Sequence, residues 1–226
     1  MPRDPVYGSS THYSGDAGVE YFAWQDASGE INGKINSRKF KSFIVGDEVI
    51  LDFGCGGGHL INSLSASEKI GVEINPIARE SAARFCKIVH GSIEEVKSES
   101  IDVVISNHAL EHVPYPIRAL SEILRVLKPG GKLILCVPID DWRTQRQYLT
   151  TDINHHLNTW TPQLLGNSLS EAGFDLAGAR ISIYTHAWFP HYLKYWKFEF
   201  IFDLICRFYS IKMRRRQIIA VVNKNV

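Results

Sequence analysis

Apolar runs alternate with amphipathic segments between residues 48 and 138. The runs are rich in Val and Ile, which is typical of buried parallel strands. The clearest amphipathic segment is Pro114–Leu127, whose Ile and Leu residues recur at helical spacing and predict a helix with one apolar face. Strands are predicted at residues 48–53, 69–74, 86–90, 101–106 and 132–138. The alternation predicts an α/β fold, a doubly wound, mostly parallel sheet with helices on both faces.

The two ends of the chain are less regular. Residues 1–46 begin as a loop with interleaved aromatic residues and continue into a predicted helix at Asn32–Val45. This N-terminal segment can pack as an ordinary layer or cover a crevice as a lid; we favour packing for the helix and keep the aromatic loop as a lid candidate. Residues 47–226 form the predicted main domain, with a loop at 139–160 and a helix from Thr161 to Gly173. A sixth strand is expected within residues 174–184 and a seventh at Gln217–Asn223.

Composition narrows the class of protein. A net charge of +1 shows no basic excess, so we expect no nucleic-acid binding. The four cysteines are scattered without a C-x-x-C pair, which argues against a zinc site or a disulfide framework and favours a reducing compartment. No apolar run reaches the roughly 18 residues of a membrane span. We therefore expect a cytoplasmic protein.

The stretch Val49–Leu60 carries the clearest chemical signal. It reads V-I-L-D-F-G-C-G-G-G-H-L, a strand that ends in Asp52 and a glycine-rich turn. Such a turn lets the backbone approach a nucleotide ligand. The dinucleotide pattern G-x-G-x-x-G, counted from Gly54, would place its third glycine at His59, and no P-loop Gly-Lys-Ser/Thr follows. The turn predicts a nucleotide crevice without naming the ligand.

Four motifs follow one another in order: L-D-F-G-C-G-G-G, G-V-E-I-N-P, I-D-V-V-I-S-N-H-A-L-E-H-V and E-I-L-R-V-L-K-P-G-G-K-L-I-L. As a set they resemble the Rossmann-like (class I) S-adenosylmethionine-dependent methyltransferases, most closely the small-molecule group. The resemblance implies a seven-stranded sheet with an antiparallel last strand. It also implies S-adenosyl-L-methionine as cofactor and S-adenosyl-L-homocysteine as product.

The resemblance assigns cofactor contacts to residues of the first two motifs. Asp52 can face the cationic amino-acid end of the cofactor, while Gly54 and Gly56 let the backbone approach. Glu73 ends the second strand, where a carboxylate can accept both ribose hydroxyls, and Ile74 would lie against the adenine.

Three further contacts are expected after the third and fourth strands. Ser92 stands where the family often has an acid that binds the adenine amino group, and its hydroxyl can accept the same hydrogen bond more weakly. The backbone N–H of Ile93 can share that contact. Asn107 is implied near the methionyl moiety.

Histidines near the crevice are the candidates for chemistry on the acceptor. His108, Glu111 and His112 would share one face if helical, which could gather a metal; the other interpretation is that Glu111 and His112 fix the following loop. We predict no metal, because this motif is common in the family without one. His108 and His156 are the candidate catalytic residues, since a histidine can take a proton from the acceptor; bracing a loop is the alternative. Alignment of the acceptor alone can also suffice.

The acceptor is predicted by exclusion. No N-P-P-Y-type amine signature follows the fourth strand, so oxygen or nitrogen of a small molecule, sugar or lipid-linked glycan fits better than a nucleobase. The alternative is a non-catalytic methyltransferase-like domain that binds a ligand or partner.

The segment Trp188–Ile211 is almost entirely apolar and is followed by a basic stretch, Lys212–Arg216. Residues of about 186–214 would form an aromatic helical insertion that packs on the domain or in a homodimer. The other interpretation is peripheral membrane contact through 188–216, which would bring the enzyme to a lipid-linked substrate.

Overall fold

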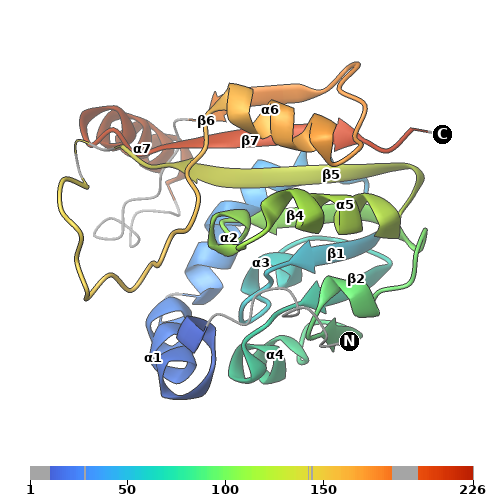
Figure 1. The fold of residues 1–226 in the computed structure, drawn as a ribbon, viewed down its shortest axis with the longest axis horizontal. Coiled ribbons are helices and arrows are strands. Elements are labelled where there is room, and N and C mark those ends of the chain that lie inside the picture. The colour runs from blue at the N-terminus through green and yellow to red at the C-terminus, as the bar shows by residue number, and fades with distance from the viewer. Residues whose placement is uncertain (1–10, 28, 142, 144, 185–197, 226) are drawn as a thin grey trace, which may run out of the picture.

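The computed structural model describes residues 11–27, 29–141, 143, 145–184 and 198–225. In this part of the chain one seven-stranded sheet has the order β3-β2-β1-β4-β5-β7-β6 (Figure 1). Its strands are Val49–Phe53 (β1), Glu68–Val72 (β2), Ile88–His90 (β3), Ile101–Asn107 (β4), Leu127–Ile139 (β5), Arg180–Tyr184 (β6) and Arg216–Asn223 (β7). The first five strands pair in parallel, and β7 is antiparallel to both β5 and β6. The predicted α/β sheet with an antiparallel last strand is confirmed.

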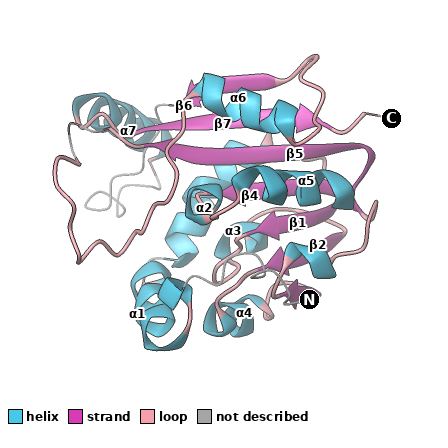
Figure 2. Cartoon of the chain, in the orientation of Figure 1, coloured by secondary structure: helices cyan, strands magenta, loops and turns pink. Residues whose placement is uncertain are grey.

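Helices cover both faces of this sheet (Figure 2). They are Gly15–Asp26 (α1), Gly29–Lys41 (α2), His59–Asn62 (α3), Pro76–Ala82 (α4), Pro116–Val126 (α5), Pro162–Glu171 (α6) and Glu199–Lys212 (α7). Three short 3₁₀ helices are Thr11–Tyr13 (η1), Ile93–Glu95 (η2) and Leu110–His112 (η3). One core cluster joins the sheet to α5 and α6, and a second joins the opposite face to α2 and α3. Alternate residues of β1 supply both clusters, as the two-residue period of a strand requires.

Local signals set several helix boundaries. The Asn75 side chain accepts a hydrogen bond from the Ile77 amide (3.0 Å), and Pro76 is the first residue of α4. The Thr161 hydroxyl caps α6 in the same way, with Leu164 as donor (3.1 Å). Proline needs no hydrogen bond at the first helical position, so each Asn/Thr-Pro pair starts a helix efficiently. These starts agree with the sequence prediction.

The structure differs from the predicted elements at three places. Residues 15–26 form a helix where the glycines predict a loop, because Gly18 packs directly against Tyr13 and its carbonyl accepts from the Asn75 side chain (2.8 Å). The segment after the glycine turn, at residues 58–66, predicts a helix, but only the short helix α3 forms there. The sequence Lys128-Pro-Gly-Gly131 predicts a helix stop, and α5 does end before it at Val126, but β5 already begins at Leu127 and not at residue 132. Tertiary packing and strand pairing outweigh local propensity at these positions.

Helix α7 lies between β6 and β7 in the sequence and packs by one face on α2. Phe202 and Cys206 are fully buried and form a cluster with Ile35 of α2, and Arg38 pairs with Asp203 at 2.9 Å. The opposite face carries exposed apolar side chains. Most of the predicted aromatic insertion that precedes α7, at residues 185–197, lies outside the described residues. Among the described helices none is both long and apolar enough to cross a bilayer.

Candidate active site

A pocket of about 130 Å³ opens at the carboxyl ends of β1, β2 and β4. This is the edge where parallel α/β sheets bind their ligands. Six of the ten predicted site residues line it, namely Gly54, Glu73, Ile74, Ser92, Ile93 and His108. The other four do not line it: Asp52, Gly56, Asn107 and His156.

The glycine turn forms one wall of the pocket. Gly54 has φ of +75°, and a Cβ on it would lie 2.4 Å from the Cβ of Ala109. The amides of Gly54 and Cys55 both donate to the carbonyl of Val72, at 2.8 and 3.1 Å, which holds the turn against β2. Only glycine fits this conformation and this close approach without strain.

Glu73 connects the turn to the second strand. One carboxylate oxygen accepts from the amide of Gly56 (2.8 Å) and the other from the amide of Asn75 (2.8 Å). Burial raises the pKa of Glu73, and the two hydrogen bonds partly oppose that rise. Each carboxylate oxygen keeps a second lone pair. The side chain therefore braces the turn and can still accept hydrogen bonds from a ligand with two adjacent hydroxyls.

Asp52 is buried directly behind the turn. Neither of its carboxylate oxygens has a hydrogen-bond partner in the described chain, and its side chain does not reach the pocket wall. Burial, and then the nearby charge of Glu73, raise its pKa to about 8. An unpaired buried carboxyl is costly, so this site favours a ligand that brings hydrogen-bond donors or positive charge.

Of the residues expected around the adenine and the methionyl group, Ser92 and Ile93 line the pocket and Asn107 does not. Ser92 lines the pocket, and its hydroxyl donates to the carboxylate of Glu94, so an acid lies two residues beyond the expected position. Ile93 is a pocket-lining core residue. The side-chain oxygen of Asn107 instead accepts from the Lys39 ammonium (3.0 Å), away from the pocket wall.

A buried polar cluster lies on the other side of β4, and sequence reasoning missed two of its members. Lys39 is buried and also donates to the side-chain oxygen of Gln217 (2.7 Å), which lies 3.2 Å from Nε2 of His108. Burial lowers the pKa of Lys39. Its position was detectable, because Lys39 is four residues from both Ile35 and Phe43 on the apolar side of the predicted helix.

His108 faces the pocket from a strained backbone position. Its φ is +56°, uncommon for a residue with a side chain. Burial and the nearby Lys39 charge lower its pKa to about 3. The imidazole is therefore neutral near pH 7, able to make hydrogen bonds but weak as a base.

The N-terminal segment covers the pocket. Tyr13 and Tyr21 line it, and the Tyr13 hydroxyl lies 2.7 Å from Nδ1 of His112. The rings of His12 and His155 stack with centroids 4.6 Å apart. The aromatic loop considered as a lid thus contacts both the pocket and the segment around residue 155.

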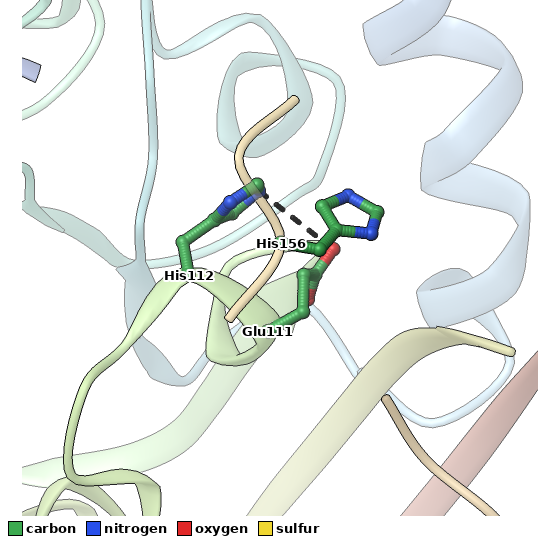
Figure 3. A group of neighbouring side chains, drawn as sticks. All are labelled: Glu111, His112 and His156. Atoms are coloured by element: carbon green, nitrogen blue, oxygen red, sulfur yellow. Dashed lines mark ion pairs between the residues drawn. The ribbon is translucent and has the colours of Figure 1, made fainter. Parts of the chain in front are cut away.

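Glu111, His112 and His156 lie together beside the pocket (Figure 3). No helix joins His108 to Glu111 and His112, because only the short helix η3 forms and it begins at Leu110, but Nδ1 of His108 still lies 3.7 Å from the Glu111 carboxylate. His156 instead comes from the loop before α6, with Nδ1 held by the Asp140 carboxylate at 2.9 Å. Of the three side chains only His112 lines the pocket.

The pKa values of Glu111, His112 and His156 are shifted in different directions. Burial raises the pKa of Glu111 to about 8 and lowers that of His112 to about 4. Burial also lowers the pKa of His156, but the hydrogen bond and charge of Asp140 outweigh it and leave that pKa raised.

Known protein families match the part of the chain that carries most of the pocket-lining residues. Residues 21–177 match a family model described as a methyltransferase domain. A ubiquinone biosynthesis O-methyltransferase from Nitrosococcus oceani is 37% identical over 99 residues, which cover 37% of this chain and 41% of that protein. The chain therefore matches about two fifths of that relative's length.

Solved structures share the fold at low sequence identity. A SAM-dependent methyltransferase from Archaeoglobus fulgidus superposes with a TM-score of 0.64 at 17% identity, covering 90% of this chain and 99% of that one. The Haemonchus contortus phosphoethanolamine N-methyltransferase 2 in complex with S-adenosyl-L-methionine has a TM-score of 0.65 at 17% identity, covering 96% of this chain and 59% of that one.

Proposed function

Because the chain belongs to the methyltransferase domain family, we propose that it is an S-adenosylmethionine-dependent methyltransferase acting on oxygen or nitrogen of a small molecule. Membership of the family confirms the resemblance carried by the four motifs. One observation carries the proposal furthest: Glu73 lines the pocket while its carboxylate holds the amide of Gly56 in the glycine turn. A ligand with a ribose and a cationic end suits this arrangement.

The cofactor contacts follow from the pocket walls. Glu73 would accept the ribose hydroxyls, and the adenine would lie between Ile74 and the Ser92–Ile93 segment, which face the same pocket. The unpaired carboxyl of Asp52 suits the cationic amino-acid end, through water or after a shift of the turn. The cofactor's sulfonium supplies a methyl group that is already activated for in-line attack.

The protein's own contribution is positioning. His108, with a pKa of about 3, is a weak proton acceptor near neutral pH and would orient the acceptor by hydrogen bonding. His156 is more basic and is held by Asp140, but it does not line the pocket. Alignment of the two reactants supplies much of the rate enhancement in such transfers.

The acceptor would enter beside Tyr13 and Tyr21. The O-methyltransferase relative favours a small-molecule acceptor, and a sugar or lipid-linked glycan is the finer proposal. The aromatic walls suit a ligand with an apolar face.

Calorimetry tests the proposal. S-adenosylmethionine and S-adenosylhomocysteine should both bind the wild-type protein, and NAD should not. Binding of NAD alone would contradict the proposal. Tight binding of both sulfur ligands without methyl transfer to any compound of a broad small-molecule panel would favour the alternative, a non-catalytic domain.

We further propose that α7 makes peripheral contact with an anionic membrane surface. Its outer face carries five exposed apolar side chains: Phe200, Ile201, Leu204, Phe208 and Ile211. Arg214, Arg215 and Arg216 follow and are exposed too. An apolar face flanked by basic residues is typical of interfacial helices. None of the four cysteines, all of which lie in the described part of the chain, forms a disulfide bond, which supports the proposal of a reducing, cytoplasmic setting.

Co-sedimentation with phosphatidylserine-containing vesicles tests the contact. The wild-type protein should sediment with the vesicles, and replacing the three arginines by glutamine should release it. Absent or unchanged sedimentation would contradict membrane contact. Concentration-dependent dimerisation in analytical ultracentrifugation that is lost in Phe208→Ser would assign the face to a homodimer instead.

A further inference from the structure

We propose that Glu111, His112 and His156 form a binding site for a divalent transition-metal cation on the acceptor side of the pocket (Figure 3). One ligand atom from each residue lies within 4.8 Å of the others. Atoms bound to one Zn²⁺ ion lie about 3 Å apart, so shifts of about an ångström would complete the site. Binding of the cation does not depend on the proposed methyltransferase activity. Any role of the bound cation in catalysis does rest on that proposed activity.

Glu111 supplies the first argument. Its side chain is fully buried, and both carboxylate oxygens lack a hydrogen-bond partner among the residues that the structure describes. The nearest imidazole nitrogens are too distant for hydrogen bonds, at 3.7 Å (His108) and 3.9 Å (His112). A buried carboxylate is retained when it is paired or coordinates a metal.

The hydrogen bonds of the two histidines supply the second argument. Nδ1 of His156 is held by the Asp140 carboxylate, which leaves Nε2 free. Nδ1 of His112 lies 2.7 Å from the Tyr13 hydroxyl oxygen and 3.5 Å from the His155 carbonyl oxygen, which can only accept, and a proton on Nδ1 satisfies both contacts. Both rings then carry the proton on Nδ1 and present the Nε2 lone pair. Metal-binding histidines characteristically have such an oxygen partner on the second nitrogen.

Backbone contacts hold the ligands in place before any ion binds. The carbonyl of Glu111 accepts from the amides of Leu157 (2.9 Å) and Asn158 (3.0 Å). The side chain of Asn158 also donates to the carbonyl of Val113 (2.8 Å). These bonds join the η3 segment to the segment carrying His156. A site built in this way needs little ordering when it binds a cation.

The ligand set selects the class of cation. Two imidazoles and one carboxylate suit Zn²⁺, Fe²⁺ or Co²⁺ and are unsuited to Mg²⁺ and Ca²⁺, which prefer oxygen ligands. Three protein ligands leave at least one coordination position open. Because His112 also lines the pocket, the open position would be available to an oxygen or nitrogen atom of the acceptor. An ion can enter from the pocket, since the His112 and His156 side chains keep 14% and 20% of their exposure.

Cobalt titration tests the site. Tag-free full-length protein is stripped with a chelator and titrated with Co²⁺, following the visible absorption of the coordinated ion and its displacement by Zn²⁺. We expect one equivalent to bind. Glu111→Gln and His156→Asn should each weaken binding at least about 10-fold. Asp52→Asn is the matched control, because Asp52 is also buried and unpaired but has no histidine cluster.

The outcomes separate the interpretations. Weakening confined to Glu111→Gln and His156→Asn would support the site. Absent binding in the wild type, or Glu111→Gln binding like the wild type, would overturn it. If circular dichroism shows that Glu111→Gln does not fold, the partly exposed His156→Asn decides. Wild-type protein that binds Co²⁺ but not S-adenosylhomocysteine would sink the methyltransferase proposal and leave the metal site standing.

Discussion

Asp52 and Glu111 are two buried carboxyl groups in opposite halves of the active-site region, and they start from the same physical situation. Both lack hydrogen-bond partners on both oxygens among the described residues, and burial raises both pKa values to about 8. Their neighbours differ. Glu73 adds negative charge beside Asp52, whereas His112 and His156 offer neutral or basic nitrogens beside Glu111. The surroundings of a buried carboxylate therefore decide whether it suits an organic cation or a metal ion.

We call the side of the pocket with Asp52, Gly54 and Glu73 the cofactor half and the side with Glu111, His112 and His156 the acceptor half. The largest expected effect comes from a substitution in the cofactor half, at Gly54. Gly54→Ala combines a left-handed φ with a clash against Ala109. We expect a loss of about 2–4 kcal/mol in the free energy of unfolding and loss of measurable cofactor binding. Urea denaturation and calorimetry measure the two effects.

Gly178 offers the matched control for this substitution. It has a similar φ of +80°, but a Cβ there would meet no atom within 4 Å. Gly178→Ala should cost about 1 kcal/mol and leave cofactor affinity unchanged. If the two substitutions lowered the free energy of unfolding equally, the close approach of Gly54 to Ala109 would be unimportant.

A smaller effect should appear in the pH dependence of stability. The pKa of Asp52 is about 8 in the folded protein and near 3.8 when the chain unfolds. The folded state thus holds a proton that the unfolded state loses, and the free energy of unfolding should fall as pH rises from about 4 to about 8. Asp52→Asn should remove a slope of up to ~1.4 kcal/mol per pH unit.

Urea denaturation of the wild type and Asp52→Asn across this pH range measures the slope. Saturating S-adenosylmethionine should flatten the wild-type slope, because its ammonium group favours the ionised carboxyl. Identical slopes in the two proteins without ligand would contradict the buried, unpaired state of Asp52.

The smallest effect is expected on the acceptor side. Tyr13→Phe removes the hydrogen bond to His112 and with it one tie between the N-terminal segment and η3. We expect about 1 kcal/mol lower stability and faster amide hydrogen exchange in residues 11–26. Tyr21→Phe, which changes another tyrosine of the same pocket, should have a weaker effect. Wild-type stability in Tyr13→Phe would assign the cover to packing alone, because Phe keeps the ring and lacks only the hydroxyl.

The pocket wall at Gly54 and Glu73 was recognisable from sequence, whereas the contacts on the acceptor side were not, and the difference has a physical reason. Asp52 and Gly54 lie at the end of β1, and Glu73 directly follows β2, the parallel strand reached through the glycine turn and α3. The strand pattern and the glycine turn of this unit are both visible in the local sequence. All seven strands and most helices were likewise recognisable from their apolar period and their Pro, Asn or Thr signals.

The acceptor half is assembled from segments far apart in the chain. His156 meets Glu111 through a loop of no regular period, and Tyr13 reaches His112 across 99 positions. The resemblance implies that Asn107 lies near the methionyl moiety, but Asn107 is the last residue of β4 and its side-chain oxygen accepts from Lys39 of α2. Such partners depend on loop packing and side-chain hydrogen bonds, which local pattern does not encode.

One titration tests the division into two halves most directly. S-adenosylhomocysteine is titrated calorimetrically into wild type, Glu73→Ala and Glu111→Gln, with circular dichroism as the folding control. We expect about 100-fold weaker binding in Glu73→Ala, which loses charged hydrogen-bond acceptors, and affinity within about threefold of wild type in Glu111→Gln. Wild-type affinity in Glu73→Ala, or an equal loss in Glu111→Gln, would contradict it.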